Sequence, residues 1–312
     1  METILITGGT GLIGKALTRL LIQHNYHVTI LTRDPKKATA SGAFGNQVTY
    51  AAWDVKAQTI DVEAIKRANA IIHLAGAGVV DKRWTDAYKK EIIDSRIESS
   101  KLLVKALSET QHHVKTFISS SAIGWYGADN AQSLQSGFTE EVPADDSFLG
   151  QTCKLWEASV KPVKALDIRL VTIRTGIVLA KEGGAFAEFK KPVTMGVAAV
   201  LGNGDQKVSW IHIDDLCGIY LYAFENKSMT GSYNAVAPAP VTNQVLTDNI
   251  AKTLKGKFYI TIHVPRFVLK LVLGESSIEV LKSATVSSKK IEMAGYTFKW
   301  PAIHDAVSNL LS

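Results

Sequence analysis

Short apolar runs alternate with helical patterns through the first 180 positions of the chain. The apolar runs, rich in β-branched residues, lie at 3–7, 27–32, 47–53, 70–76, 115–120 and 169–175, and helical stretches lie at 12–24, 84–108 and 151–166. Continuous apolar strands separated by helices are typical of a parallel sheet covered on both faces, because each crossover returns the chain to the same end of the sheet. The pattern predicts an α/β fold with a Rossmann-type, doubly wound parallel sheet.

The regular alternation lapses after residue 180. A glycine-rich stretch, EGGAFAEF, precedes an expected loop, VTMGVAAVLGNGDQ, and the apolar pattern returns at 208–224. Beyond Pro240 we expect a helix–strand–helix tail with a strand at 259–264 and helices at 266–282 and 302–311. The predicted division is therefore a dinucleotide-type domain at 1–180, also taking in about 207–236, and a smaller C-terminal α/β lobe at 181–312, with the substrate in the cleft between them.

Composition changes this picture little. The chain has 312 residues, a formal charge of +6 and 46% hydrophobic residues, and its basic pairs are dispersed rather than gathered as a nucleic-acid groove requires. Cys153 and Cys217 lack metal-like or disulfide-framework spacing, which favours a reduced setting. No signal-peptide pattern or membrane-length apolar run is present, so we expect a cytoplasmic protein whose partner is a small molecule, with neither nucleic acid nor membrane, and with a homodimer left open.

Three glycines separate the first predicted strand from the first helix. Gly8, Gly11 and Gly14 in ILITGGTGLIGK follow a strand and open a βαβ unit, the context in which such a loop binds a dinucleotide. Glycine allows the sharp turn and the close approach of backbone to a pyrophosphate, and the helix amino terminus supplies amide donors. The expected cofactor contacts in this loop are Gly8, Thr10, Gly11, Leu12, Ile13 and Gly14.

The end of the second strand discriminates between cofactors. Arg33 in ILTRDP is a cation suited to a ribose 2′-phosphate, which favours NADP (NADPH) over NAD, although Asp34 would reverse that choice if it faced the ribose. Asp54, after the third strand, is either an adenine contact or a loop aspartate. The small residues that end the fourth strand would let a cofactor lie against the backbone: Ala75, Gly76 and Ala77.

With the glycine loop, HLAGAG and SSSAIGWYG in view, the sequence resembles the extended and atypical branch of the short-chain dehydrogenase/reductase superfamily. More closely, it is similar to the NAD-dependent epimerase/dehydratase-like proteins, a sugar-nucleotide epimerase-like subgroup sometimes labelled cell-division-inhibitor-like. Longer blocks carry this likeness along nearly the whole chain, among them RWTDAYKKEIIDSRIESS, RTGIVLAKEGGAF and VSWIHIDD. The resemblance implies the fold and the cofactor but not the substrate.

The resemblance also implies a catalytic set that this chain carries incompletely. In the superfamily a tyrosine transfers the proton, a lysine four residues later lowers the tyrosine pKa and binds the nicotinamide ribose, and a serine after the fifth strand orients the substrate oxygen. Lys154 matches the lysine and Ser121 the serine, with Ser119 beside it at the cofactor, but Gly150 occupies the tyrosine position. Tyr126 is the expected replacement, as proton donor or substrate wall.

Further residues are expected near the substrate or the nicotinamide. Indole faces suit rings or sugars, and plain core packing is the alternative for each tryptophan. Arg96 would meet an anionic substrate or the cofactor, or be solvated, and His212 is either a titrating group or a structural strand-end residue. The expected substrate contacts are Trp84, Arg96, Trp125, Trp210 and His212, and the expected nicotinamide contact is Gly176.

Two functions follow from these residues. The first is an NADP-dependent oxidoreductase or epimerase-like enzyme acting on a small carbonyl or sugar-type substrate without the usual tyrosine, with Ser121 holding the substrate oxygen. The second is a non-catalytic NADP(H)-binding redox sensor or regulator. Retention of Lys154 and Ser121 favours the enzyme, and Gly150 favours the regulator.

Overall fold

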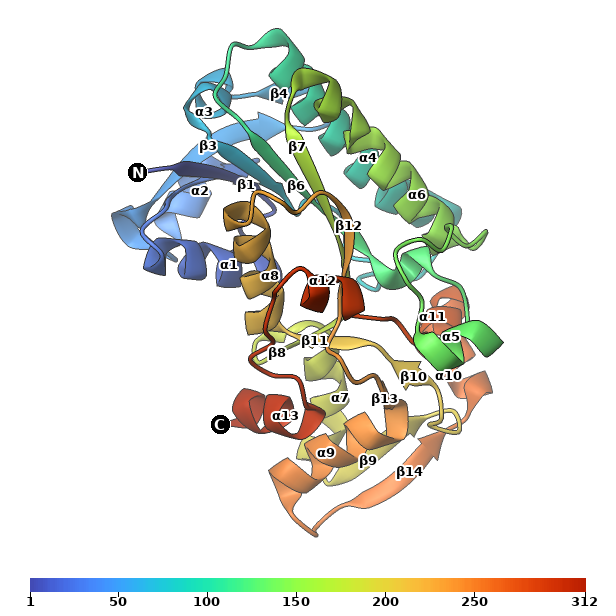
Figure 1. Ribbon diagram of the computed structural model, residues 1–312. Coiled ribbons are helices and arrows are strands. Elements are labelled where there is room, and N and C mark those ends of the chain that lie inside the picture. The colour runs from blue at the N-terminus through green and yellow to red at the C-terminus, as the bar shows by residue number, and fades with distance from the viewer.

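The computed structural model describes residues 1–312 as a large sheet-containing half and a smaller half below it (Figure 1). The large sheet has eight strands in the order β12-β7-β6-β5-β1-β2-β3-β4 and is parallel except for the last pair. Its strands are β1 (Thr3–Thr7), β2 (His27–Thr32), β3 (Val48–Asp54), β4 (Thr59–Ile60), β5 (Ala70–His73), β6 (Thr116–Ala122), β7 (Arg169–Thr175) and β12 (Gly231–Ala235). The predicted α/β, doubly wound sheet is confirmed.

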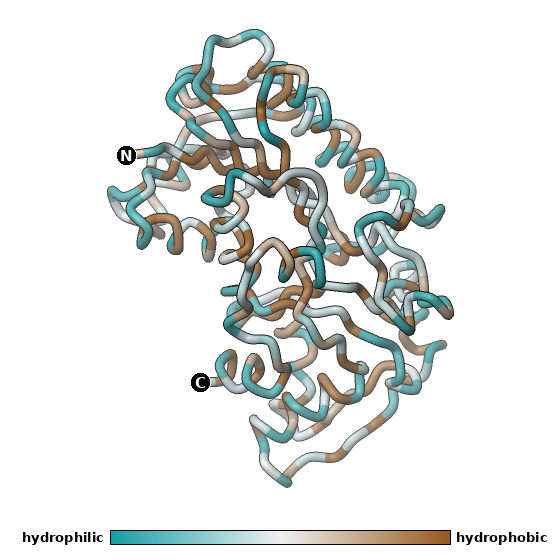
Figure 2. Tube along the Cα trace, viewed as in Figure 1, coloured by the Kyte–Doolittle hydropathy of each residue, from teal (hydrophilic) through white to brown (hydrophobic).

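Helices cover both faces of this sheet, as the continuous apolar strands predicted. On one face α1 (Leu12–Gln23) and α8 (Ile213–Glu225) pack together over Ile4, Ile6 and Ile30. On the other, α3 (Val62–Arg67), α4 (Asp86–Glu109) and α6 (Phe148–Val160) pack over Leu5, Leu31 and Phe117. Figure 2 shows the hydrophobic strands gathered between these helices. The first expected helical stretches are thus reproduced, the third with its end at 161–166 in 3-10 form (η3).

The smaller half is built on short strand pairs and three helices. Strands β8 (Ile177–Ala180) and β11 (Trp210–His212) pair in parallel, as do β9 (Val197–Leu201) and β14 (Ile260–Val264), whereas β10 (Lys207–Val208) and β13 (Val241–Thr242) are antiparallel. Helices α7 (Gly184–Thr194), α9 (Asn243–Lys255) and α13 (Ile303–Leu311) enclose a separate core around Phe186 and Trp210.

Two expectations for this half are wrong in detail. The stretch expected to be a loop contains β9, because its alternating VAAVL buries Ala198 and Val200 and pairs with a strand about sixty residues later. The helix expected at 266–282 is broken at Gly274, whose φ of 67° ends it. The result is α10 (Arg266–Leu273), the 3-10 turn η4 (Gly274–Ser276) and α11 (Ser277–Leu281).

The chain returns to the large sheet late in the sequence. β12 pairs with β7 at the sheet edge, and α8 lies on the face beside α1, so residues 213–235 complete the first half although they follow β8, β9, β10 and β11 in the chain. The remaining short elements are α2 (Pro35–Ala40), α5 (Ala131–Ser136), α12 (Lys289–Met293), η1 (Gly45–Gln47) and η2 (Ile123–Trp125). None of the helices is both long and apolar enough to cross a membrane.

Candidate cofactor and substrate site

The glycine loop forms a turn with no room for side chains. Gly8 has a φ of 70°, which favours glycine, and a Cβ there would lie 2.9 Å from the carbonyl carbon of Leu74. A Cβ on Gly14 would lie 2.2 Å from the Gly8 oxygen, so only glycine lets α1 pack against the loop. Gly11 is the N-cap of α1 and makes no side-chain cap bond, and the first-turn amides of Leu12 and Ile13 have no intrahelical acceptor. The loop therefore presents backbone donors at a helix amino terminus.

At the end of β2, the acidic and basic neighbours have different surroundings. Asp34 is the N-cap of α2, and its Oδ1 accepts a hydrogen bond from the Lys37 amide at 2.9 Å. Arg33 is exposed, and its guanidinium has no hydrogen bond or ion pair. Of the two side chains, only the aspartate is engaged by the protein, through one of its carboxylate oxygens.

Asp54 closes a turn after β3. Its Oδ1 accepts hydrogen bonds from the amides of Lys56 and Ala57, at 2.8 and 3.0 Å. These backbone hydrogen bonds hold the pKa of the carboxyl below its usual value. These hydrogen bonds are those of a loop aspartate, the second of the two alternatives expected for Asp54. The other carboxylate oxygen of Asp54 accepts no hydrogen bond.

The small residues after β5 border the glycine loop. Thr7 Oγ1 accepts hydrogen bonds from the amides of Leu74 and Ala75, and Ser95 Oγ accepts one from Ala77. Gly76 is exposed, and a Cβ there would lie 3.2 Å from the Arg96 side chain. The segment is thus fixed by strand β1 on one side and α4 on the other.

The placement of α6 does not fit the roles expected at 150 and 154. Lys154 is exposed and makes no hydrogen bond or ion pair. Gly150 is buried, and a Cβ there would lie 2.1 Å from the Asp145 oxygen, so no tyrosine fits that position. The pair four residues apart that faces the end of β6 is instead Leu149 and Cys153, which both approach Gly124. Lys154 lies on the exposed side of α6, and its contact with the nicotinamide ribose stays a prediction.

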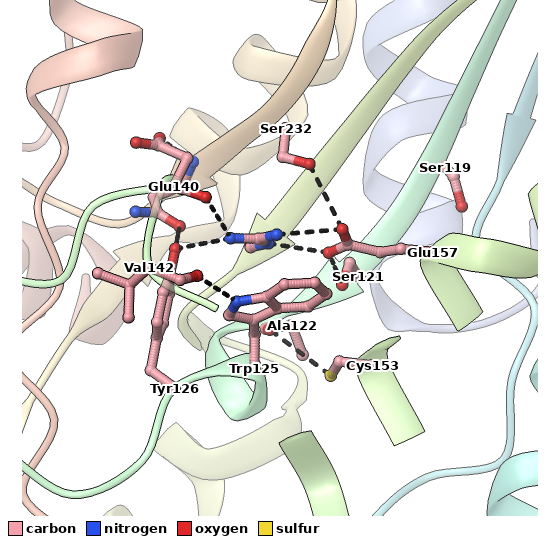
Figure 3. Close-up of polar contacts among 12 residues, drawn as sticks. Ser119, Ser121, Ala122, Trp125, Tyr126, Glu140, Val142, Cys153, Glu157 and Ser232 are labelled. Carbon is pink, nitrogen blue, oxygen red and sulfur yellow. Dashed lines mark hydrogen bonds and ion pairs between the residues drawn. The ribbon is translucent and has the colours of Figure 1, made fainter. Parts of the chain in front are cut away.

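Ser121 belongs to a buried polar network (Figure 3). Its Oγ donates to Glu157 Oε1 at 2.8 Å, and Glu157 accepts from Arg174 through both carboxylate oxygens, Nε to Oε1 at 2.8 Å and Nη2 to Oε2 at 3.1 Å. The Glu157 and Arg174 side chains are 8% and 3% exposed. Ser119, also buried on β6, donates to the Ser120 carbonyl. The proton of Ser121 is therefore committed to Glu157, which leaves the Ser121 oxygen as an acceptor.

Tyr126 lies in the same network and not on a free surface. It is fully buried, its hydroxyl donates to Asn234 Oδ1 at 2.7 Å, and Arg174 Nη1 donates to that hydroxyl at 3.0 Å. Burial raises the pKa of Tyr126 to about 12. The surroundings of Tyr126 argue against both expected roles, since the hydroxyl is already saturated by protein and the ring stacks on Phe138.

The other aromatic candidates divide into core and edge. Trp210 is fully buried and its Nε1 donates to the Ala239 carbonyl, which is core packing. Trp125 lies under Arg174, whose guanidinium carbon is 3.7 Å from the ring centroid, and Trp84 packs edge-on against Phe148. Both remain partly exposed. Only these two keep a surface that a substrate could touch.

His212 and Gly176 are held by protein partners. His212 is the N-cap of α8, its Nδ1 accepts from the Asp214 amide at 3.0 Å, and burial lowers its pKa. These contacts are those of a structural residue at the end of a strand, the second of the two alternatives expected for His212. The Gly176 amide donates to the Ala235 carbonyl, and a Cβ there would lie 2.7 Å from the Ser209 oxygen. Contact of Gly176 with the nicotinamide therefore stays a prediction that could involve only its remaining backbone atoms.

Sequence reasoning missed Glu157, Leu149 and the part that Arg174 takes in the network. One signal was available, because Cys153 and Glu157 are four residues apart on a helix and so share a face. The pairing of Glu157 with Arg174, which lies on β7, was not predictable. It depends on how strands that are distant in sequence are arranged in the sheet. A surface groove between α1 and α8 of about 700 Å³ shares only Leu12 with the expected site residues.

Comparisons with known proteins show the family to which the chain is similar. The model of the NAD dependent epimerase/dehydratase family matches residues 4–149, and a domain of unknown function, DUF1731, matches residues 264–310. An epimerase family protein of Staphylococcus haemolyticus, SH2119, is 32% identical over 100% of this chain and 99% of its own. The protein YfhF of Bacillus subtilis is 32% identical over 99% and 98%.

Solved structures give the same result. Human epimerase family protein SDR39U1, determined with NADPH, superposes with a TM-score of 0.84 at 28% identity, covering 99% of each chain. The UDP-glucuronic acid 4-epimerase of Bacillus cereus superposes with a TM-score of 0.79 at 19% identity, over 98% of this chain and 97% of that one, and shows the common fold.

Proposed function

Because the chain belongs to the epimerase family, as its full-length relatives establish, we propose that it is an NADP(H)-dependent oxidoreductase or epimerase-like enzyme for a small carbonyl or sugar-type substrate. The observation that carries the proposal is the glycine loop, where the positions of Gly8 and Gly14 exclude any Cβ and α1 presents uncapped amides. Such a cradle fits a pyrophosphate. The likeness to the NADPH-bound human protein supports the same cofactor.

The preference for NADP(H) rests on the side chains after β2. The Asp34 carboxylate caps α2, whereas the Arg33 guanidinium is exposed and unpaired. A guanidinium forms charge-assisted hydrogen bonds with a 2′-phosphate, and the Lys37 amide holds one oxygen of the Asp34 carboxylate.

A bound nicotinamide would accept or supply the hydride, and the residues of the chain would orient the substrate and handle the proton. Ser121 is suited to orienting the substrate, because its proton is donated to Glu157 and its oxygen accepts a hydrogen bond from a substrate hydroxyl. Arg174 holds the Glu157 carboxylate in place through hydrogen bonds to both of its oxygens. Since the Tyr126 hydroxyl is enclosed and donates to Asn234, we propose that the substrate hydroxyl gives its proton to the Ser121 oxygen as Ser121 passes its own proton to the Glu157 carboxylate.

Calorimetric titration with NADPH and NADH tests the cofactor proposal. We expect NADPH to bind more tightly, and Arg33→Ala to lose roughly tenfold or more of the NADPH affinity while NADH binding changes little. Lys36→Ala, a nearby exposed cation, is the matched control and should keep the preference. Failure of the wild type to bind either nucleotide would refute the proposed function.

A second function is favoured by the inward face of α6. Leu149 cannot exchange a proton, and burial raises the pKa of the Cys153 thiol to about 11, so neither reproduces the tyrosine and lysine of the superfamily. This favours a non-catalytic NADP(H)-binding sensor. A screen of carbonyl and sugar substrates, followed by nicotinamide absorbance, separates the two: any turnover that Ser121→Ala abolishes establishes the enzyme.

A further inference from the structure

Arg96, in the middle of α4, is a buried cation without an acidic partner. The residue is 9% exposed, and its one hydrogen bond runs from Nη1 to the Ile92 carbonyl at 2.8 Å. It forms no ion pair. The guanidinium carbon lies 4.9 Å from the Trp156 ring centroid, which offers a weak attraction but no counter-charge.

The second buried arginine of this region shows what a structural arginine looks like. Arg174 has a bidentate carboxylate partner in Glu157 and further hydrogen bonds to Tyr126 and to the Glu140 carbonyl. A buried charge is ordinarily paired in this way, because desolvation without a partner is costly. Arg96 departs from that rule, and most of its guanidinium donors have no protein acceptor.

The titratable groups around Arg96 do not supply the missing charge. They are Tyr88 on the same helix, Cys153 on α6 and His73 on β5. Burial lowers the pKa of His73 to about 3 and raises that of Cys153 to about 11, and burial also raises the pKa of Tyr88. All three are neutral near pH 7, so the positive charge of Arg96 is uncompensated.

The position of Arg96 relates it to the substrate side of the site. A Cβ on Gly76 would lie 3.2 Å from both Cγ and Cζ of Arg96, so the arginine lies directly behind the exposed backbone that follows β5. In the sheet order, β5, β6 and β7 lie on one side of β1, and β2 with Arg33 lies on the other. A dinucleotide spans the two halves, with its adenosine toward β2 and its nicotinamide toward β5 and β6.

We propose that Arg96 binds an oxyanion of the substrate, a carboxylate or phosphate, beside the nicotinamide. The proposal rests on the proposed function and adds the chemical class of the substrate. Gly76 keeps the approach clear of side chains, and Trp156 holds the guanidinium plane. A substrate anion would complete the ion pair that the folded protein leaves open, and neutral carbonyl compounds would lack this interaction.

The test combines oxyanion binding with stability in wild type, Arg96→Met and Arg96→Lys. The probes are inorganic phosphate and malonate, titrated calorimetrically into protein saturated with NADPH. We expect at least one of the two anions to bind the wild type. Arg96→Met should lose roughly tenfold or more of that affinity, and Arg96→Lys should recover part of it. NADPH affinity should change less than about threefold in Arg96→Met.

Stability without ligand separates a binding role from a structural one. Replacing an unpaired buried cation by methionine removes an uncompensated charge, so Arg96→Met should unfold at the same urea concentration as wild type or a higher one. Arg174→Met is the matched control and should unfold earlier, because it leaves Glu157 buried and unpaired.

Three outcomes would overturn the proposal. The first is equal binding of phosphate and malonate by wild type and Arg96→Met. The second is a loss of NADPH affinity in Arg96→Met that exceeds tenfold, which would assign Arg96 to a cofactor phosphate. The third is a destabilisation of Arg96→Met comparable with that of Arg174→Met. If the wild type fails to bind NADPH, the proposed function falls by itself, and the same titrations without nucleotide still decide whether Arg96 binds an oxyanion.

Discussion

At the scale of single residues, the buried side chain of His73 makes the stability of the fold depend on pH. It is completely buried between Thr7 Oγ1, 2.7 Å from Nδ1, and Ser100 Oγ, 3.1 Å from Nε2, and burial lowers its pKa to about 3. Between pH 3 and 6.5 the unfolded chain binds a proton that the folded chain excludes. His73 therefore stabilises the fold above pH 6.5, and this contribution is lost as the pH falls.

The resulting prediction concerns stability between pH 7 and pH 5. We expect this group alone to lower the free energy of unfolding by about 2 kcal/mol over that interval. Urea unfolding at each pH measures the effect. His73→Gln should be less stable at pH 7 but show a shallower pH dependence, and an identical slope in the variant would contradict the assignment.

Gly150 allows a second residue-scale prediction. A Cβ at this position would lie 2.1 Å from the Asp145 oxygen, whereas position 154 on the same helix is exposed. Gly150→Ala should cost about 1–3 kcal/mol because the Asp145 loop must move, and Lys154→Ala should stay within about 0.5 kcal/mol of wild type. Chemical denaturation of both variants measures the difference. A neutral Gly150→Ala would mean that the turn before α6 is looser than described.

At the scale of elements, α8 is joined to the C-terminal segment by one carboxylate. Asp215 is 1% exposed, and it accepts hydrogen bonds from the amides of Lys299 at 2.7 Å and Trp300 at 2.9 Å and from the Tyr296 hydroxyl at 3.1 Å. Its place in the first turn of α8 also suits the helix dipole. The tertiary hydrogen bonds give it the larger role of fixing the chain before α13.

Asp215→Ala should therefore release this segment. We expect a loss of about 1–3 kcal/mol, because the amides of Lys299 and Trp300 lose their acceptor. Hydrogen exchange should accelerate first at the amides of residues 299 and 300. Asp305→Ala, which alters an exposed first-turn acid, is the control. Unchanged exchange at those amides in Asp215→Ala would show that packing alone holds the segment.

Elements with local signals were predictable from sequence, and elements defined by distant partners were not. The strands of the large sheet and helix α1 follow from apolar runs and the glycine loop. By contrast, β9 depends on β14, and the ion pair between Glu157 and Arg174 depends on the packing of α6 against the sheet. The comparison of Gly150 and Lys154 with a tyrosine–lysine pair relied on spacing alone. In the folded chain the residues four apart on α6 that approach Gly124 are Leu149 and Cys153.

At the scale of the whole molecule, the large sheet is completed by residues that follow position 210. β12 supplies its last strand, and α8 buries nine residues, many of them in the core shared with α1. A chain ending at residue 180 would leave β7 as an open edge and expose the part of one sheet face that α8 covers. The two halves are thus continuous in structure although the sequence separates them.

We expect residues 1–180 alone to give no cooperative thermal transition and no NADPH binding. The lost contacts include Ile219, Tyr220 and Phe224, all buried against the sheet side that α1 shares. Circular dichroism during heating and calorimetric titration with NADPH measure both properties, with the full chain as the control. A sharp transition of the shorter chain would show that α1 and its strands form an independent unit.

The two cysteines have a consequence for the chemistry of the intact molecule. Burial raises the pKa of Cys153 to about 11 and that of Cys217 further still, and the thiols lie on opposite faces of the large sheet, on α6 and α8. At pH 7 both cysteines are therefore thiols rather than thiolates, so alkylating agents and peroxide react with them slowly. Covalent modification of either thiol requires local opening of the structure around it. The labelling rate of Cys153 therefore reports opening on the α6 side of the sheet, and that of Cys217 reports opening on the α8 side.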